Sequence, residues 1–174
     1  GFQHTIIFKY QHSLTRVLKK EWNPNYILSS GEFTTDYLKH KISKQISIKT
    51  LGSPKSKSER IKNININNRI LFIPSGEEKE TDFFSKFAFK FAKEYPEYEI
   101  LIRFHPIINR DKFVKKFSKI NNFKISKSNI ELDSSESRYV IYSTSTAVFE
   151  SIKLGCIPIR LNWNSINDLS DPLW

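Results

Sequence analysis

Residues 70–74, Ile-Leu-Phe-Ile-Pro, decide the fold, because they form an uninterrupted apolar run that ends in Pro74-Ser75-Gly76. Such a run is typical of a strand buried on both faces of a sheet. Outward from it, apolar runs at 99–104, 123–125, 139–142 and 156–161 alternate with helical periodicity at 81–94, 110–120 and 144–154. Alternating strands and helices indicate parallel βαβ units with right-handed crossovers. We therefore expect an α/β fold with a Rossmann-like, doubly wound parallel sheet.

The sequence before this pattern differs in character. Residues 1–54 hold short apolar runs, at 26–29 and 46–51, each followed by a turn that contains glycine. Residues 55–68 are rich in Lys, Ser and Asn and lack aromatic residues, which is typical of a linker. We therefore divide the chain into a partial domain over 1–54, a linker over 55–68 and the sheet domain over 69–174.

The charge of the chain is strongly positive and unevenly spread. The net charge is +10, and residues 1–76 hold 13 Lys and Arg against 4 Asp and Glu, whereas residues 77–174 hold 15 against 14. An anionic partner would explain this excess: nucleotide phosphates, an acidic polysaccharide or an anionic inner membrane contacted peripherally. The alternative is a solvated basic face without a partner.

Several classes of protein are excluded by what the sequence lacks. The single cysteine, Cys156, allows no intramolecular disulfide, and no run approaches the roughly 18 apolar residues that a membrane span needs. We expect a cytoplasmic protein. The motifs GxGxxG, GxxxxGK[ST], HExxH and GxSxG do not occur, and His4, His12 and His40 lack metal-ligand spacing. We expect no metal and no bound cofactor, and the absence of RNP, KH or helix-turn-helix patterns argues against nucleic acid as a partner.

The candidate site lies where the predicted strands end, because ligands of such sheets bind outside the carboxyl ends of the strands. Four hydroxyl residues follow the strand at 139–142 and open the next predicted helix, where unpaired N–H groups attract phosphate. They are Ser143, Thr144, Ser145 and Thr146. Helical spacing places Ser143, Thr146 and Glu150 on one stripe, so the turn would hold a phosphate and Glu150 would approach the ribose. The alternative is that Ser143 or Thr144 only caps the helix and Glu150 is solvated.

Two other strand ends contribute candidates. His105 precedes Pro106, which favours an extended backbone, so its imidazole would point toward the sheet edge and donate a hydrogen bond to phosphate. Arg103 would share its side of the strand. Ser75 and Gly76, after the first strand, complete the predicted phosphate site. A lone histidine is more often structural, but the coincidence of His105 with the hydroxyl turn favours a function.

The motifs together resemble those of bacterial surface-carbohydrate and capsule glycosyltransferases of the GT-B type. Within that group the chain is similar to polysialyltransferase-like and CDP-glycerol glycerophosphotransferase-like proteins. The similar segments, in order, are Gly1-Phe2-Gln3-His4, Tyr26-Ile27-Leu28-Ser29-Ser30-Gly31, Leu51-Gly52-Ser53-Pro54, Arg103-Phe104-His105-Pro106, Tyr142-Ser143-Thr144-Ser145-Thr146, Glu150 and Gly155-Cys156-Ile157-Pro158.

The resemblance implies two Rossmann-like domains. Residues 1–54 would end the N-terminal, acceptor-side domain, and residues 69–174 would form most of the domain that binds the nucleotide donor. His4 would lie in the cleft as an acceptor-side or catalytic residue. The expected reaction moves a sugar or sugar-like unit from a nucleotide-activated donor, CMP- or CDP-linked before UDP-linked, to a glycan or lipid-linked acceptor of a surface polysaccharide, without a metal. The alternatives are a UDP-sugar epimerase of GT-B shape and a non-catalytic nucleotide- or glycan-binding module.

Overall fold

A computed structural model describes residues 6–9, 15–16, 18–42, 44–53, 64–114, 117, 120–163 and 171–173. His4, the expected catalytic residue, lies outside these ranges. The chain divides into two compact units. The first unit comprises Gly1–Glu59 with Leu169–Trp174, and the second comprises Arg60–Asp168.

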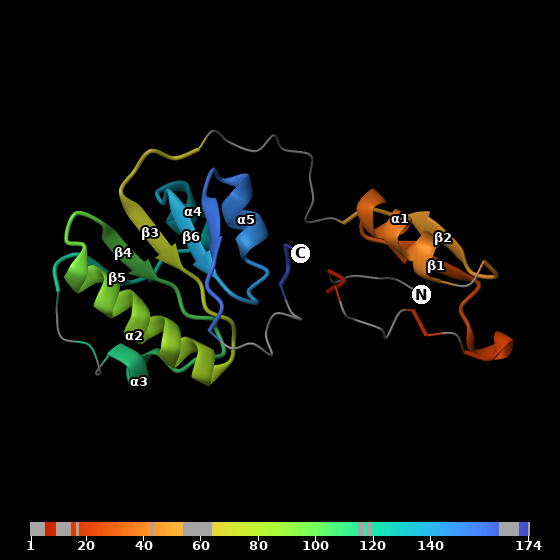
Figure 1. Cartoon of the computed structure of the whole chain (residues 1–174), viewed down its shortest axis with the longest axis horizontal. Coiled ribbons are helices and arrows are strands. Elements are labelled where there is room, and N and C mark those ends of the chain that lie inside the picture. Colours follow the sequence, from red (N-terminus) through yellow and green to blue (C-terminus); the bar gives the residue numbers. More distant parts are fainter. Residues whose placement is uncertain are drawn as a thin grey trace. The chain divides into compact units, whose positions relative to one another are not determined.

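The second unit is built on a five-stranded parallel sheet (Figure 1). Its strands are β3 (Arg69–Phe72), β4 (Glu99–Ile102), β5 (Phe123–Ile125), β6 (Tyr139–Tyr142) and β7 (Ile157–Arg160). Their order is β5-β4-β3-β6-β7, so the chain moves outward from β3 in one direction and then returns to its other side. The switch in strand order therefore lies between β3 and β6. This topology confirms the predicted Rossmann-like α/β fold.

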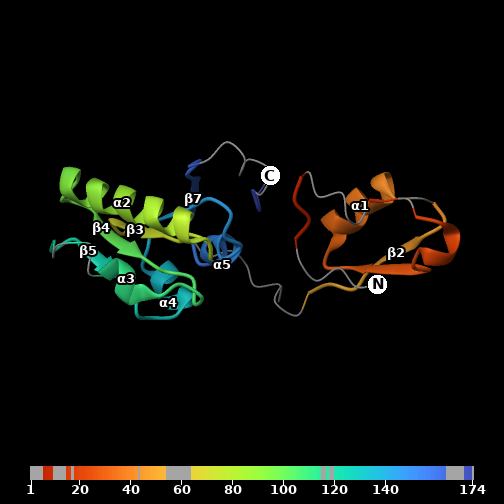
Figure 2. The same ribbon diagram turned by 90° about the horizontal axis from the view of Figure 1, so that it is seen from below.

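Four helices connect these strands: α2 (Glu78–Glu94), α3 (Arg110–Val114), α4 (Ile130–Ser135) and α5 (Val148–Lys153). Figure 2 shows α2 on one side of the sheet and α4 and α5 on the other. No described helix is long and apolar enough to cross a membrane.

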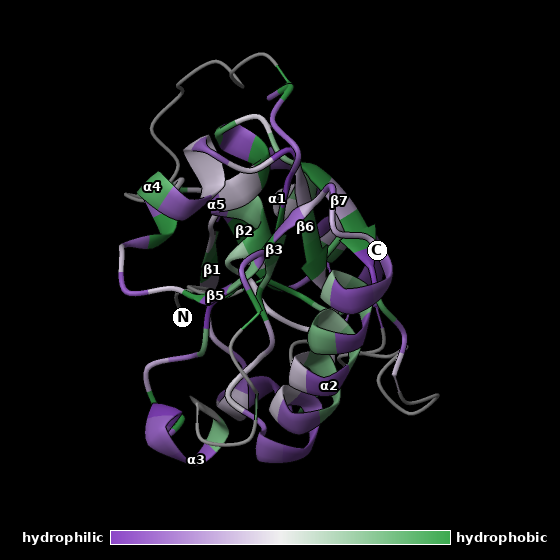
Figure 3. Ribbon diagram, turned by 90° about the vertical axis from the view of Figure 1, so that its left-hand side faces the viewer, coloured by the Kyte–Doolittle hydropathy of each residue, from purple (hydrophilic) through white to green (hydrophobic). Residues whose placement is uncertain are grey.

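The core of the second unit lies between α2 and the sheet. Phe84, Ala88 and Ala92 recur every four residues along α2 and are buried against the strands. Phe84 meets Phe72 of β3 edge to face, with ring centroids 6.4 Å apart. Burying a phenylalanine of this kind contributes about 1.5–3 kcal/mol. In Figure 3 the ribbon of α2 alternates between hydrophilic and hydrophobic residues, as expected of a helix that covers a sheet with one face.

Some predicted boundaries are wrong. The helix expected over 144–154 begins only at Val148, and residues 143–147 form a turn. Its end is as expected, because Gly155 follows it with a φ of +93°. The helix α4 was not predicted, because Ile130–Ser135 carries almost no apolar periodicity. A side chain starts it instead: Asn129 accepts a hydrogen bond from the backbone N–H of Leu132 at 2.8 Å.

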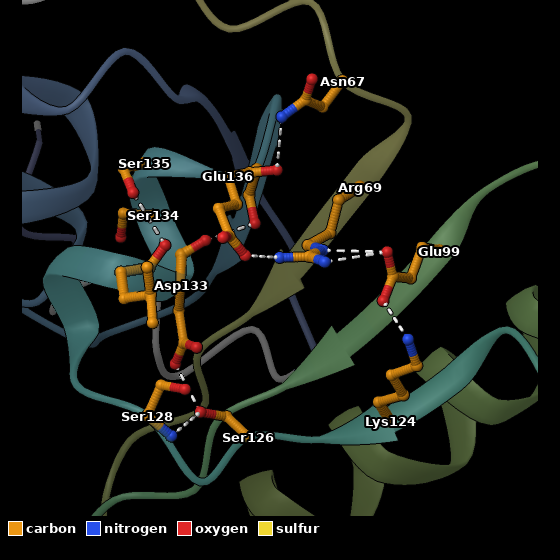
Figure 4. A network of polar contacts seen from close by, with 12 residues as sticks. Asn67, Arg69, Glu99, Lys124, Ser126, Ser128, Asp133, Ser134, Ser135 and Glu136 are labelled. Carbon is orange, nitrogen blue, oxygen red and sulfur yellow. Dashed lines mark hydrogen bonds and ion pairs between the residues drawn. The ribbon is translucent and has the colours of Figure 1, made fainter.

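The amino ends of the strands are joined by a network of charges (Figure 4). Arg69 of β3 and Glu99 of β4 are partners in register, and the Arg69 Nε and Nη2 atoms lie 3.1 and 3.0 Å from Glu99 Oε2. Arg69 also binds Glu136, and Lys124 of β5 donates to Glu99 Oε1 at 2.7 Å. Burial alone would raise the pKa of Glu99, but hydrogen bonds and charge from Lys124 and Arg69 hold it below its ordinary value. Burial alone would lower the pKa of Arg69, but its bonds to Glu136 and Glu99 raise it.

The end of the predicted linker is attached to the second unit. Asn65 Nδ2 lies 3.1, 2.8 and 3.1 Å from the carbonyl oxygens of Ser134, Ser137 and Leu154. The backbone N–H of Asn65 also donates to Gly155 at 3.1 Å. The Asn65 side chain thus links the segment before β3 to the ends of α4 and α5.

The first unit contains a βαβ motif. Strands β1 (Tyr26–Ser29) and β2 (Ser47–Thr50) pair in parallel, and α1 (Glu32–Lys41) connects them; the short 3-10 helix η1 (Lys20–Trp22) precedes them. Its core consists of Ile7, Ile27, Leu38, Ile42 and Ile46. Both strands fall on the short apolar runs noted at 26–29 and 46–51, but α1 was not predicted, because only Thr35 and Leu38 of its ten residues are buried.

Candidate functional site

A pocket of about 340 Å³ lies at the carboxyl ends of β3, β4 and β6, at the switch in strand order. Its volume falls within the usual range of small-molecule sites, roughly 300–1,000 Å³. The loops after the three strands and the start of α5 supply most of its walls. The lining residues are Ser75, Gly76, His105, Ile130, Thr144, Ser145, Thr146, Ala147 and Glu150. Seven of the residues that the sequence singled out are therefore brought together here, although their roles stay predictions.

Two of the predicted residues do not line this pocket. Ser143 is fully buried, and its hydroxyl has no hydrogen-bond partner among the described residues. The predicted helical stripe of Ser143, Thr146 and Glu150 does not form, because residues 143–147 are a turn. Thr146 and Glu150 reach the pocket, and Ser143 does not.

Arg103 is the other residue outside the lining. Its Nη1 atom lies 3.0 Å from Asp133 Oδ2 and 3.4 Å from Ser126 Oγ, and it also binds the carbonyl oxygen of Ser128. Asp133 is buried on α4 and accepts a 2.5 Å bond from Ser126, a contact drawn in Figure 4. The guanidinium therefore connects β4 to the start of α4.

His105 is placed by a close approach of two loops. An ideal Cβ at Gly76 would lie 3.2 Å from His105 Nδ1 and 3.0 Å from Ile107 Cγ2, so the absence of a side chain at residue 76 lets the loop after β3 pass close to the imidazole without displacing it. The backbone N–H of Ile107 donates to His105 Nδ1 at 3.3 Å. A neutral imidazole that accepts at Nδ1 carries its proton on Nε2. His105 can therefore act as a hydrogen-bond donor through Nε2.

Glu80 is a polar residue of this region that sequence reasoning missed. Its side chain is fully buried in the first turn of α2. It accepts hydrogen bonds from the Ser75 backbone N–H (3.0 Å), the Ser75 hydroxyl (2.7 Å) and the Thr144 hydroxyl (3.2 Å). The signal was present, because Glu80 continues the buried stripe of Phe84 and its successors backward by four residues. The expected helix began only at residue 81, so Glu80 lay just outside it.

Glu150 contributes a second carboxylate. Its Oε2 atom is buried and has no hydrogen-bond partner within the described part of the chain. Buried carboxylate oxygens are usually paired, so this oxygen is unusual in a residue that lines the pocket.

Other chemistries find little support around the site. Burial raises the pKa of the Cys156 thiol to about 12 despite its hydrogen bond to Ser134, so this thiol is a poor nucleophile. Within the described ranges no three His, Cys, Asp or Glu residues are grouped to hold a metal. A larger hollow of about 440 Å³ beside α2 is lined only by aliphatic and aromatic residues, so it offers no cation for a phosphate.

No protein-family model matches the chain, and no curated protein matches it in sequence. Among the solved structures that match the chain are the following three. The pneumococcal O-GlcNAc transferase GtfA in complex with UDP and GlcNAc has 17% identity and a TM-score of 0.53 over 79% of this chain and 30% of that one. A GtfA/B complex has 11% identity and a TM-score of 0.50 over the same shares. The beta Kdo 2,4 transferase KpsC of Thermosulfurimonas dismutans has 20% identity and a TM-score of 0.41, over 66% of this chain and 39% of that one.

These likenesses bear on the fold. At such identities the two GtfA structures support the Rossmann-like architecture of the chain. The chain spans between 30% and 39% of the lengths of the three proteins.

Proposed function

We propose that this chain is the donor-binding part of a glycosyltransferase that moves a sugar or sugar-like unit from a nucleotide-activated donor to a surface polysaccharide. The observation that carries the proposal is the pocket at the switch point, where His105 and the hydroxyls of Ser145 and Thr146 line one cavity. The fold likeness to GtfA, a protein solved with UDP and GlcNAc, supports it. The resemblance of the motifs places CMP- and CDP-linked donors before UDP-linked ones.

The residues of the pocket would act on the phosphate of the donor. His105 donates through Nε2 and the hydroxyls of Ser145 and Thr146 add two donors, so negative charge that develops on the leaving nucleotide is stabilised. One charge-assisted hydrogen bond of this kind contributes about 1.5–3 kcal/mol. We propose that the transfer needs no metal, because these hydrogen-bond donors stabilise the negative charge of the phosphate that a metal ion would otherwise stabilise. Binding that persists in EDTA agrees with this, and binding lost in EDTA contradicts it.

A thermal-shift titration with CMP, CDP, UDP and GDP tests the proposal, since a ligand that binds the native state raises its melting temperature. We expect CMP or CDP to give the largest rise and His105→Ala to weaken that ligand by at least about tenfold. His40→Ala is the matched control, because His40 is an exposed histidine of α1 that bonds a backbone oxygen of its own helix. No response to any nucleotide would contradict the proposal. Conversion of a UDP-sugar without an acceptor would instead identify an epimerase.

A further inference from the structure

The buried carboxylate of Glu80 connects two walls of the pocket. It lies on α2, yet its three hydrogen bonds go to Ser75, in the loop after β3, and to Thr144, in the loop after β6. These loops flank the switch point, and Ser75 and Thr144 both line the pocket, whereas Glu80 does not. Glu80 therefore acts on a ligand only through the two hydroxyls that it holds.

The direction of these bonds determines what the hydroxyls can offer. A hydroxyl has one proton to donate, and both Ser75 and Thr144 direct theirs to Glu80 Oε2. Ser75 Oγ also accepts from the backbone N–H of Glu77 at 3.2 Å. Toward the pocket these residues can only accept a hydrogen bond. Glu150 also lines the pocket, and a carboxylate can likewise only accept a hydrogen bond.

The remaining polar residues have the opposite character. His105 donates through Nε2, because its Nδ1 atom accepts from Ile107. Ser145 and Thr146 line the pocket and neither is buried, so each presents a hydroxyl that can donate to an anion. A carboxylate behind Ser75 and Thr144 also disfavours a phosphate on their side, because like charges repel in a partly desolvated site.

We propose that Glu80 gives the pocket its polarity and so sets the orientation of a bound nucleotide. The inference rests on the proposed function. The phosphate lies against His105, Ser145 and Thr146, and the ribose hydroxyls donate to the oxygens of Ser75 and Thr144. Glu80 is a positioning residue, and it makes the site selective for a ribonucleotide over one that lacks these hydroxyls.

The test compares binding of CDP with that of 2′,3′-dideoxy-CDP, and of UDP with its dideoxy form, by thermal-shift titration or calorimetry. We expect the native chain to bind the ribonucleotide about tenfold more tightly than the dideoxy form. This is the affinity difference that one to two neutral hydrogen bonds produce. In Glu80→Gln the amide can donate to Ser75 or Thr144 and release a hydroxyl proton toward the ligand, so the preference should fall at least about threefold. The ratio of the two affinities is the readout, because a general loosening of the fold weakens both ligands.

Glu78→Gln is the matched control, since Glu78 is an exposed residue of the same turn, paired with Lys112, and should leave the ratio unchanged. Thr144→Val removes one hydroxyl with little change in volume and should also lower the ratio. It provides the test if Glu80→Gln does not fold. A native ratio near one, or an unchanged ratio in both Glu80→Gln and Thr144→Val, overturns this inference but leaves the proposed function standing. Absence of binding by every nucleotide overturns both.

Discussion

Replacement of Gly76 by alanine tests the placement of His105 without altering any polar group. The added Cβ would lie 3.0 Å from Ile107 Cγ2, 3.2 Å from His105 Nδ1 and 3.5 Å from His105 Cγ, so both side chains must move by a few tenths of an ångström. Gly76 is not among the described glycines with a positive φ, so its backbone tolerates alanine. Because Ile107 is 75% exposed, it can yield at little expense in stability.

The larger effect falls on the imidazole. If the new methyl group displaces the imidazole, His105 Nδ1 loses the hydrogen bond from the Ile107 N–H. The Nε2 proton then no longer has a fixed orientation. If the bond to phosphate is lost altogether, binding weakens by about 1.5–3 kcal/mol, which is roughly 10- to 150-fold at 1.4 kcal/mol per factor of ten. We expect Gly76→Ala to lie at the lower end, near tenfold, while the free energy of unfolding changes by less than about 1 kcal/mol.

Calorimetric titration with the best nucleotide measures the first quantity, and urea unfolding followed by circular dichroism measures the second. Gly31→Ala is the control, because nothing lies within 4 Å of a Cβ at Gly31, which precedes α1 with an extended backbone. It should bind nucleotide as the native chain does. Unchanged binding in Gly76→Ala, together with weak binding in His105→Ala, would refute the steric reasoning.

Two further predictions concern stability. Asn65→Ala should lower the free energy of unfolding by about 2 kcal/mol, because the Leu154 carbonyl loses this side-chain donor and the single proton of the Cys156 thiol can serve only one of the Ser134 and Ser137 carbonyls at a time. Asn67→Ala, which removes one exposed bond, should lower it by less than half as much in the same urea experiment, and equal losses would contradict the argument. The pKa of Glu99 is lower in the folded chain, so its stabilisation is present above its ordinary pKa and is lost as the pH falls through the folded value. Glu99→Gln should therefore be less stable than the native chain at pH 7, and the difference should shrink toward pH 3; a difference that does not vary with pH would refute this.

The elements that could be predicted are those whose burial is strong and regular. The strands β3, β4 and β6 are continuous apolar runs, and α2 shows its buried face every four residues, so the sheet follows from the sequence. The helices α1 and α4 escaped prediction, because each buries few side chains and begins through local geometry rather than through a hydrophobic stripe. Most of the pocket could likewise be predicted, since parallel strands bring their carboxyl ends to one edge.

The placements that differ from expectation at the site depend on long-range partners and on where a helix begins, neither of which the local sequence pattern specifies. Arg103 was expected at the phosphate, but its ion-pair partner, Asp133, lies on a helix that the sequence did not indicate. Ser143 was expected on a helical face, but the turn before Val148 removes that face. Glu80 was overlooked because the expected helix began at residue 81, and its partner Thr144 lies 64 residues further along the chain.

The two ends of the sheet differ in how their carboxylates are paired. At the amino ends, Arg69 and Glu99 pair in register and Lys124 adds a second cation, so the carboxylate of Glu99 is fully paired, although Arg138 Nε is buried there without a partner among the described residues. At the carboxyl ends, Glu80 is fully satisfied by protein donors, but Glu150 keeps a buried oxygen without a partner in the described chain. An unpaired buried oxygen is destabilising by roughly 1–3 kcal/mol, and a ligand recovers that energy if the Glu150 side chain turns and brings this oxygen to the pocket that the residue lines. The pocket therefore combines one fully paired carboxylate nearby, Glu80, with one lining carboxylate, Glu150, that a bound nucleotide can pair.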